Sequence, residues 1–212
     1  MLVLPLLLEI RKRRIPTIAG NYDQGIGLAS DECGCAYKTD KEKEMGKMSI
    51  SFTNSIVEAD QRKYLRTLPA HIRVEFQLNN ERLNLLLVHG SPRKINEYLF
   101  EDREEKSLLR IMGQADADIM CFGHTHKPYH RVLQDENAHY RHAINIGSVG
   151  KPKDNNPQGC FVVLDIDETS INNTEAVQVK FIRFAYDVEK AAKAIEGSPL
   201  PNEYADMLRK GY

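Results

Sequence analysis

Three short apolar runs in this chain each end at a glycine beside a side chain that can bind a metal. Ile15–Ala19 leads into Gly20-Asn21-Tyr22-Asp23, Leu85–Val88 into His89-Gly90, and Ile119–Phe122 into Gly123-His124-Thr125-His126. Each run has the length of a β-strand, and ligand sites in α/β folds lie beyond the carboxyl ends of strands. We therefore expect three strand ends to converge on one site.

The two histidines of the last run, His124 and His126, are one residue apart. In an extended strand their side chains would point the same way, whereas in a loop past the strand end they would diverge towards two neighbouring metal ions. An isolated pair of this kind is more often a pair of surface histidines on a turn. The other two runs favour a metal site here, because neutral imidazoles with an amide oxygen suit zinc, manganese, iron or nickel.

Four ordered blocks carry a resemblance to a known family. They are Gly20-Asn21-Tyr22-Asp23, Val88-His89-Gly90, Gly123-His124-Thr125-His126 and the loop Asn145–Gly150. In this order they resemble the later signature blocks of the calcineurin-like metallophosphoesterases, in particular the small bacterial and archaeal phosphodiesterases. The resemblance runs from about residue 10 to about residue 185. It implies an α/β (α+β) fold, the four-layer α-β-β-α sandwich of that family.

Two opening blocks of the family, Asp-x-His and Gly-Asp, occur nowhere in the 212 residues. In the family they supply most ligands of one metal and the carboxylate that bridges both ions. The chain therefore resembles a member that is incomplete at its N-terminus. A sheet without interior strands leaves backbone groups unpaired, so we expect aggregation or a homo-oligomer formed through the exposed edge.

The resemblance also implies a ligand set. Asn21, His89 and His124 would bind one divalent ion, and His126 would reach the other. The intact family holds two ions, Mn, Fe, Ni or Zn, with a bridging hydroxide that attacks phosphorus in line. Because the carboxylate blocks are missing, we expect at most one ion in this chain.

Two catalytic roles follow from the same resemblance. Tyr22 stands where many members carry the histidine that protonates the leaving group, and Asp23 would orient its neighbours. A phenol, with an ordinary pKa of about 10, is a weaker general acid near neutral pH, so substrates with good leaving groups would suffer least.

The function expected is a metal-dependent phosphoesterase that acts on a phosphate ester. The alternatives are a non-catalytic metal-binding or regulatory protein on the same fold, and an interaction domain whose histidines are incidental. Metal stoichiometry separates them: two ions for the enzyme, one for the non-catalytic protein and none for the interaction domain.

Composition limits the remaining possibilities. With 42% hydrophobic and 28% charged residues, the chain is long enough for one substantial core, and we expect a single domain over residues 1–212. Its net charge of −1 gives no basis for general nucleic-acid or membrane-surface binding. The apolar segment Met1–Leu8 is too short to span a bilayer and lacks the pattern of a signal peptide, so we expect a cytoplasmic protein.

The four cysteines, Cys33, Cys35, Cys121 and Cys160, lack the spacing of a disulfide framework. Cys33-Gly34-Cys35 is compatible with a redox pair or half a zinc site. No second pair of this kind follows, which favours ordinary reduced thiols.

Periodicity and capping residues predict the other elements. Helices are expected up to Arg11–Arg14, behind Thr39 with a core stripe of Met45, Met48 and Phe52, over 58–68, after a cap at Asp102, over 187–197 and at 202–210. Strands are expected over 72–78, 83–88, 160–166 and 177–184, with a turn at Asn79-Asn80. His130, His139 and His142 are interpreted as half-exposed hairpin residues.

Overall fold

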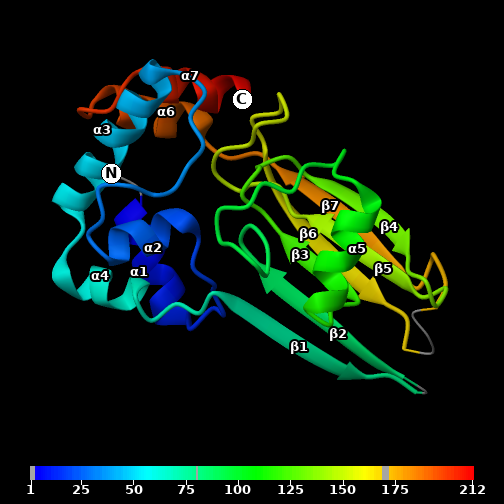
Figure 1. The fold of residues 1–212 in the computed structure, drawn as a ribbon. Coiled ribbons are helices and arrows are strands. Elements are labelled where there is room, and N and C mark those ends of the chain that lie inside the picture. Colours follow the sequence, from blue (N-terminus) through cyan, green and yellow to red (C-terminus); the bar gives the residue numbers. More distant parts are fainter. Residues whose placement is uncertain (1–2, 80, 169–171) are drawn as a thin grey trace.

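A five-stranded mixed sheet forms the centre of the molecule in the computed structural model, which describes residues 3–79, 81–168 and 172–212 (Figure 1). Its strands are β1 (His71–Gln77), β2 (Arg82–Val88), β3 (Ile119–Phe122), β4 (Tyr129–Gln134) and β5 (Tyr140–Asn145), in the order β1-β2-β3-β5-β4. The inner strands β2, β3 and β5 run parallel, while β1 and β4 pair antiparallel with their neighbours. Of the turn expected at Asn79-Asn80, Asn80 lies outside the described residues.

The alternating side chains of this sheet feed two separate cores. On one face Leu86, Met120 and Phe122 pack with Leu108 and Met112 of helix α5 (Glu105–Gln114). On the other face Leu83, Ile119 and Ile144 meet a second sheet. Because a strand turns successive side chains to opposite faces, the apolar run Ile119–Phe122 is buried on both sides of the sheet.

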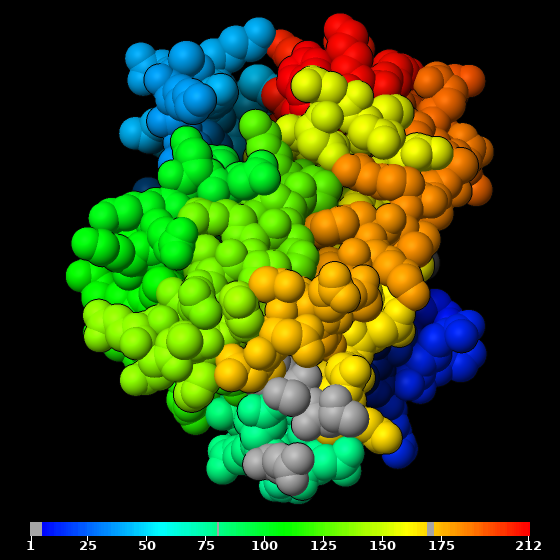
Figure 2. All heavy atoms as spheres, turned by 90° about the vertical axis from the view of Figure 1, so that its right-hand side faces the viewer, coloured from blue at the N-terminus to red at the C-terminus, as the bar shows by residue number. Residues whose placement is uncertain are grey.

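The second sheet contains β6 (Gly159–Ile166) and β7 (Val177–Phe184), paired antiparallel. Its inner side chains, such as Val162 and Phe181, pack against the central sheet. Its outer face carries Phe161, Val163 and Ile182, which are 36–42% exposed. Figure 2 shows the side of the molecule on which β6 and β7 reach the surface.

The remaining helices lie beside the sheets and at their upper end (Figure 1). They are α1 (Val3–Arg13), α2 (Asn21–Gly27), α3 (Asp40–Ile56), α4 (Ala59–Leu65), α6 (Val188–Glu196) and α7 (Glu203–Lys210). The helices α2, α3 and α4 share a third core around Ile26, Ile50 and Leu65. Within the described ranges, no helix combines the length and apolar character needed to cross a bilayer. The expected mixed α/β class is confirmed.

The strand expected over Ile15–Ala19 is wrong. This segment is an extended loop that pairs with no described strand, and its bond to a distant segment runs from Ala19 N to Pro69 O (2.9 Å). Pro16 has no N–H to give to a ladder, which weakens the segment further as a strand. The loop ends where α2 begins at Asn21, so helix geometry, and not a strand end, positions this residue.

Three local expectations are also corrected. Met48 is 50% exposed on α3, where Ile50 takes the buried position. The helix expected after Asp102 is capped at Glu104. His142 is only 1% exposed because it lies on the face of β5 that is covered by the second sheet.

Candidate metal centre

Two parallel strands position the histidines of the site. His89 follows β2 and His124 follows β3, and these strands are direct neighbours. The amide of Gly123 donates to the carbonyl of His89 (2.8 Å), which continues the pairing one step past the strand ends. This bond sets the two loops side by side, so both imidazoles leave the sheet at the same edge.

Three polar atoms from three segments converge at this edge. His89 Nε2 lies 2.9 Å from Asn21 Oδ1 and 3.1 Å from His124 Nδ1. The carbonyl oxygen of Asn21 carries no proton, so the three atoms share at most one hydrogen between them. Such a convergence of lone pairs is typical of a cation site. These two contacts bring Asn21, His89 and His124 together, and the expected place of His126 in the same cluster stays a prediction.

Burial keeps the three site histidines neutral near neutral pH. It lowers the pKa of His89, His124 and His126 to about 4, and the charge of neighbouring basic groups adds to the effect. His124 Nε2 is buried and has no hydrogen-bond partner of normal geometry. The backbone of Asn96 lies near enough to the His124 ring to raise its pKa slightly, against the larger effect of burial. Neutral imidazoles with free lone pairs are the form that binds a metal.

The segment between His124 and His126 is a loop and not an extended strand. Of the two conformations considered for this pair, the structure therefore has the loop past the strand end. Both histidines have a positive φ, 62° and 61°, which non-glycine residues adopt rarely and mostly at functional sites. Asn145 holds this loop by donating to Gly123 O and Thr125 Oγ1, both at 2.9 Å.

His126 Nδ1 lies 2.6 Å from the carbonyl of Lys151. Because a carbonyl only accepts, Nδ1 must donate, and the lone pair of this ring is then on Nε2. Its expected role as ligand of a second ion stays a prediction.

Asn21 is oriented by its own amide nitrogen. Nδ2 donates to the carbonyl of Cys33 (2.8 Å) and to Cys35 Sγ (3.3 Å), which leaves Oδ1 facing His89. Asp23 accepts from the amide of Gly20 (2.8 Å) and so closes the first turn of α2. Burial raises the pKa of the Asp23 carboxyl. Its expected role in orienting neighbouring groups stays a prediction that this contact supports.

Tyr22 directs its hydroxyl to α3, where it donates to Ser49 Oγ (2.7 Å). Burial raises the pKa of Tyr22 to about 12. A phenol held in this way is a poor proton donor near neutral pH. The general-acid role of Tyr22 stays a prediction, and this geometry does not favour it.

Sequence reasoning missed several residues around the site. Lys151 and Lys153 are half-buried beside His126, and burial lowers the pKa of Lys151 to about 8. Tyr98 packs its ring 4.2 Å, between centroids, from that of His124. The two lysines follow directly on the block Asn145–Gly150, which was a usable signal. For Tyr98, no spacing in the sequence pointed to the site.

The donor set fits one divalent ion. Asn21, His89 and His124 supply an amide oxygen and two imidazole nitrogens, which leaves positions open for other ligands. Within residues 3–79, 81–168 and 172–212, no group of three or more His, Cys, Asp or Glu side chains is placed to hold a metal. The carboxylates that a second ion would need are thus not assembled at this edge.

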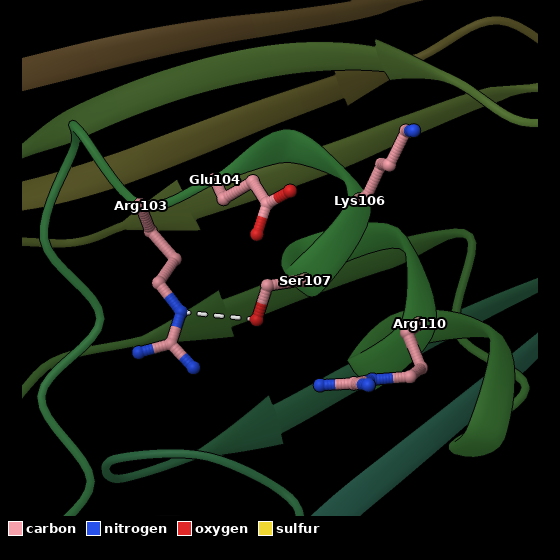
Figure 3. Close-up of a pocket in the computed structure, with 5 residues that line it drawn as sticks. All are labelled: Arg103, Glu104, Lys106, Ser107 and Arg110. Atoms are coloured by element: carbon pink, nitrogen blue, oxygen red, sulfur yellow. Dashed lines mark hydrogen bonds between the residues drawn. The ribbon is translucent and has the colours of Figure 1, made fainter.

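A separate hollow of about 420 Å³ opens at the start of α5 (Figure 3). It is lined by Arg103, Glu104, Lys106, Ser107 and Arg110, none of which belongs to the histidine cluster. Arg103 is held by its bond to Ser107 Oγ (3.0 Å). The hollow is basic but lies outside the convergent site.

Comparison with known proteins gives a consistent result. A protein of Methanocaldococcus jannaschii, uncharacterized protein MJ0912, is 24% identical over 216 residues, covering 95% of this chain and 78% of that protein. Two solved structures share the fold at 20% identity. A metallophosphoesterase from Sphaerobacter thermophilus has a TM-score of 0.68, covering 97% of this chain and 81% of that one. The hypothetical protein PH1004 from Pyrococcus horikoshii has a TM-score of 0.74, covering 99% and 79%.

The family profile described as the calcineurin-like phosphoesterase superfamily domain matches residues 3–169, a stretch that contains every convergent residue of the site. The chain belongs to the calcineurin-like phosphoesterase superfamily.

Proposed function

We propose that this protein is a phosphoesterase that depends on a single divalent metal held by Asn21, His89 and His124, so that hydrolysis, and not the two ions of the intact family, distinguishes it from a non-catalytic metal-binding protein. The observation that carries the proposal is the approach of three lone-pair atoms within 2.9 and 3.1 Å. Two of these residues are buried, Asn21 at 8% and His124 at 6% exposure. Since one hydrogen on His89 Nε2 cannot satisfy both neighbouring acceptors fully, a cation among the three atoms would remove a cost of burying polar groups. A divalent ion in this position would supply Lewis-acid polarisation of a phosphoryl oxygen.

The cations beside the site support an anionic substrate. Lys151 and Lys153 are half-buried next to His126, and the Lys153 charge lowers the His126 pKa. An amine in this position would pair with a phosphoryl oxygen when substrate is present. The His126 Nε2 lone pair is free to accept a proton or a hydrogen bond from the reacting groups.

The preferred substrates are phosphodiesters with good leaving groups. Tyr22 is the residue that the family resemblance assigns to leaving-group protonation, yet its hydroxyl is bonded to Ser49 and its pKa is raised to about 12. Activated aryl diesters need no proton on the departing oxygen. They are therefore the substrates that this site would cleave best.

A non-catalytic metal-binding protein is the second candidate. It is favoured by one observation, the lack of a carboxylate among the convergent side chains of the described residues. A cytoplasmic location is part of the proposal for either candidate, because all four cysteines are free thiols, as proteins of reducing compartments have them.

Hydrolysis of a bis-aryl phosphodiester by the full chain with Mn²⁺ tests the proposal. We expect metal-dependent turnover that His89→Ala lowers by more than about 100-fold, which exceeds the usual effect of losing an outer-shell partner. His139→Ala is the matched control, because His139 is exposed on the β4–β5 turn and should leave the rate unchanged. Metal binding without any hydrolysis would favour the second candidate, and equal rates for both variants would contradict the site.

A further inference from the structure

The thiols of Cys33 and Cys35 face each other directly behind the metal centre. Their sulfur atoms are 2.9 Å apart, and both cysteines are free. Gly34 between them has a φ of +66°, which folds the backbone so that two side chains at i and i+2 meet. Asn96 holds the turn by donating from Nδ2 to Gly34 O (2.7 Å). The pair is thus built into a fixed turn and is not a chance contact.

The sulfur separation distinguishes two kinds of dithiol site. Two thiolates on one zinc ion, with Zn–S bonds of about 2.3 Å in tetrahedral geometry, stand about 3.8 Å apart. A disulfide joins its sulfurs at about 2.05 Å. At 2.9 Å the two sulfurs of Cys33 and Cys35 are too close for a shared metal and need only a short approach to bond.

The same turn sets the orientation of a candidate metal ligand. Asn21 Nδ2 donates to Cys33 O and to Cys35 Sγ, and its Oδ1 faces His89. Whichever sulfur moves, a disulfide replaces the Cys35 thiol that now accepts from the Asn21 amide by a sulfur bonded to Cys33. The chemical state of the dithiol is therefore coupled to the position of Oδ1 at the site.

We propose that Cys33 and Cys35 are a redox-active dithiol that a hydroperoxide oxidises to a disulfide, and that this disulfide weakens the hydrogen bond that Asn21 Nδ2 donates to Cys35 Sγ. One sulfur attacks the peroxide, an S–O bond forms, the O–O bond breaks and one water leaves. The second sulfur then attacks the sulfenic sulfur, so that an S–S bond forms, the S–O bond breaks and the second water leaves. Two thiols and one hydrogen peroxide thus give one disulfide and two waters.

The consequence for metal binding rests on the proposed function. Outer-shell partners of a ligand typically contribute 10- to 100-fold to metal affinity. Since the Cys33 carbonyl remains as an acceptor, the disulfide should weaken Mn²⁺ binding by about 10-fold. A thiol reductant should restore the original affinity, because the disulfide is the reversible step of cysteine oxidation.

The first arm of the test needs no metal. The full chain is treated with hydrogen peroxide, denatured and alkylated, and its intact mass and the ¹⁵N resonance of the Asn21 side-chain amide are recorded. We expect alkylation to fall from four sites to two, a disulfide within the peptide that carries Cys33 and Cys35, and a shifted Asn21 resonance. Cys35→Ser should abolish the disulfide, whereas Cys160→Ser, at a cysteine 2% exposed, should leave it intact.

Four alkylated thiols after peroxide, or a disulfide with an unmoved Asn21 resonance, would overturn the proposal. The second arm measures Mn²⁺ affinity of the reduced and oxidised chain. If the reduced chain binds no Mn²⁺, the proposed function fails while the first arm still decides the dithiol. If the oxidised chain binds Mn²⁺ as tightly as the reduced chain, the link from the dithiol to the site is wrong.

Discussion

Burial of neutral histidines is the main electrostatic feature of single residues in this protein. His142 is the clearest case outside the candidate metal centre: it is 1% exposed, its Nδ1 lies 3.0 Å from His130 Nε2, and its own Nε2 is buried without a partner. Burial, aided by His130, lowers the pKa of His142 to about 4. An imidazole that resists protonation in the fold but not in the unfolded chain makes stability depend on pH.

The sign of this effect follows from the proton count. Between pH 6.5 and about 4 the unfolded chain binds a proton at His142 that the folded chain refuses, so stability is lost as the pH falls through this window. We expect His142 to account for about 2 kcal/mol of the loss between pH 7 and pH 5. Urea unfolding of the wild type and of His142→Gln at both pH values measures it. Parallel pH dependence in the two proteins would contradict the assignment.

Among single residues, the sequence indicated the side chains that converge at the candidate site and missed the residues that hold them in place. Asn21, His89 and His124 were recognisable because each comes shortly after an apolar run and belongs to one of the four blocks that keep the family's order. The contacts of Tyr98 and Cys35 depend on loops that meet only in three dimensions. Contacts between loops that are distant in the sequence leave no local pattern of residues from which they could be predicted.

Among the elements, the turn after β2 connects the central sheet to the site. Gly90 lies at the start of this turn, and the chain then comes back close to it. A Cβ atom on Gly90 would be 2.5 Å from Ile95 O and 2.8 Å from Glu97 O. Both neighbours are backbone atoms, which cannot rotate away. The same turn leads to Tyr98, whose ring packs on His124.

Gly90→Ala should therefore destabilise the fold by about 2 kcal/mol, in the range of overpacked interior sites. Gly113→Ala is the matched control, because a Cβ there would meet nothing within 4 Å and Gly113 lies inside helix α5. That substitution should stabilise by about 0.5 to 1 kcal/mol. Thermal unfolding of both variants checks the pair, and a Gly90→Ala protein as stable as the wild type would disprove the close approach.

Helices and strands were predicted correctly where the hydrophobic periodicity was strong. The prediction failed for a segment that needed a neighbouring strand in order to form one. The alternation over residues 72–88 predicted the β1–β2 hairpin, because each side chain's face is decided locally. Ile15–Ala19 has the composition of a strand, but a strand forms only beside another strand, and none of the described strands lies along it.

At the scale of the whole molecule, the second sheet leaves an apolar surface uncovered. Phe161 and Ile182 are directly paired across β6 and β7, and both are more than a third exposed together with Val163. The family resemblance predicts a four-layer sandwich. The described part of the chain places α5, the central sheet and β6–β7 in successive layers, with this outer face open.

We expect a second copy of the chain to cover this face, because exposed apolar sheet faces promote association. Sedimentation velocity should show a concentration-dependent dimer that Ile182→Lys weakens. Gln178→Lys adds the same charge at an exposed position of β7 and should have a smaller effect. A monomer at every concentration tested would contradict this expectation.

The family and the fold class were predictable because four blocks keep their order along the chain, while the layering depends on contacts between distant segments. Beyond the family and the fold, we propose that one divalent ion is bound by Asn21, His89 and His124, whose polar atoms converge.

Elemental analysis of the full chain, equilibrated with Mn²⁺ and then freed of unbound metal, measures this binding. We expect one ion per chain in the wild type and none in His89→Ala, since a pair of remaining ligands holds a metal poorly. A wild-type chain that holds two ions tightly or holds none, or an ion retained by His89→Ala, would contradict this ligand set.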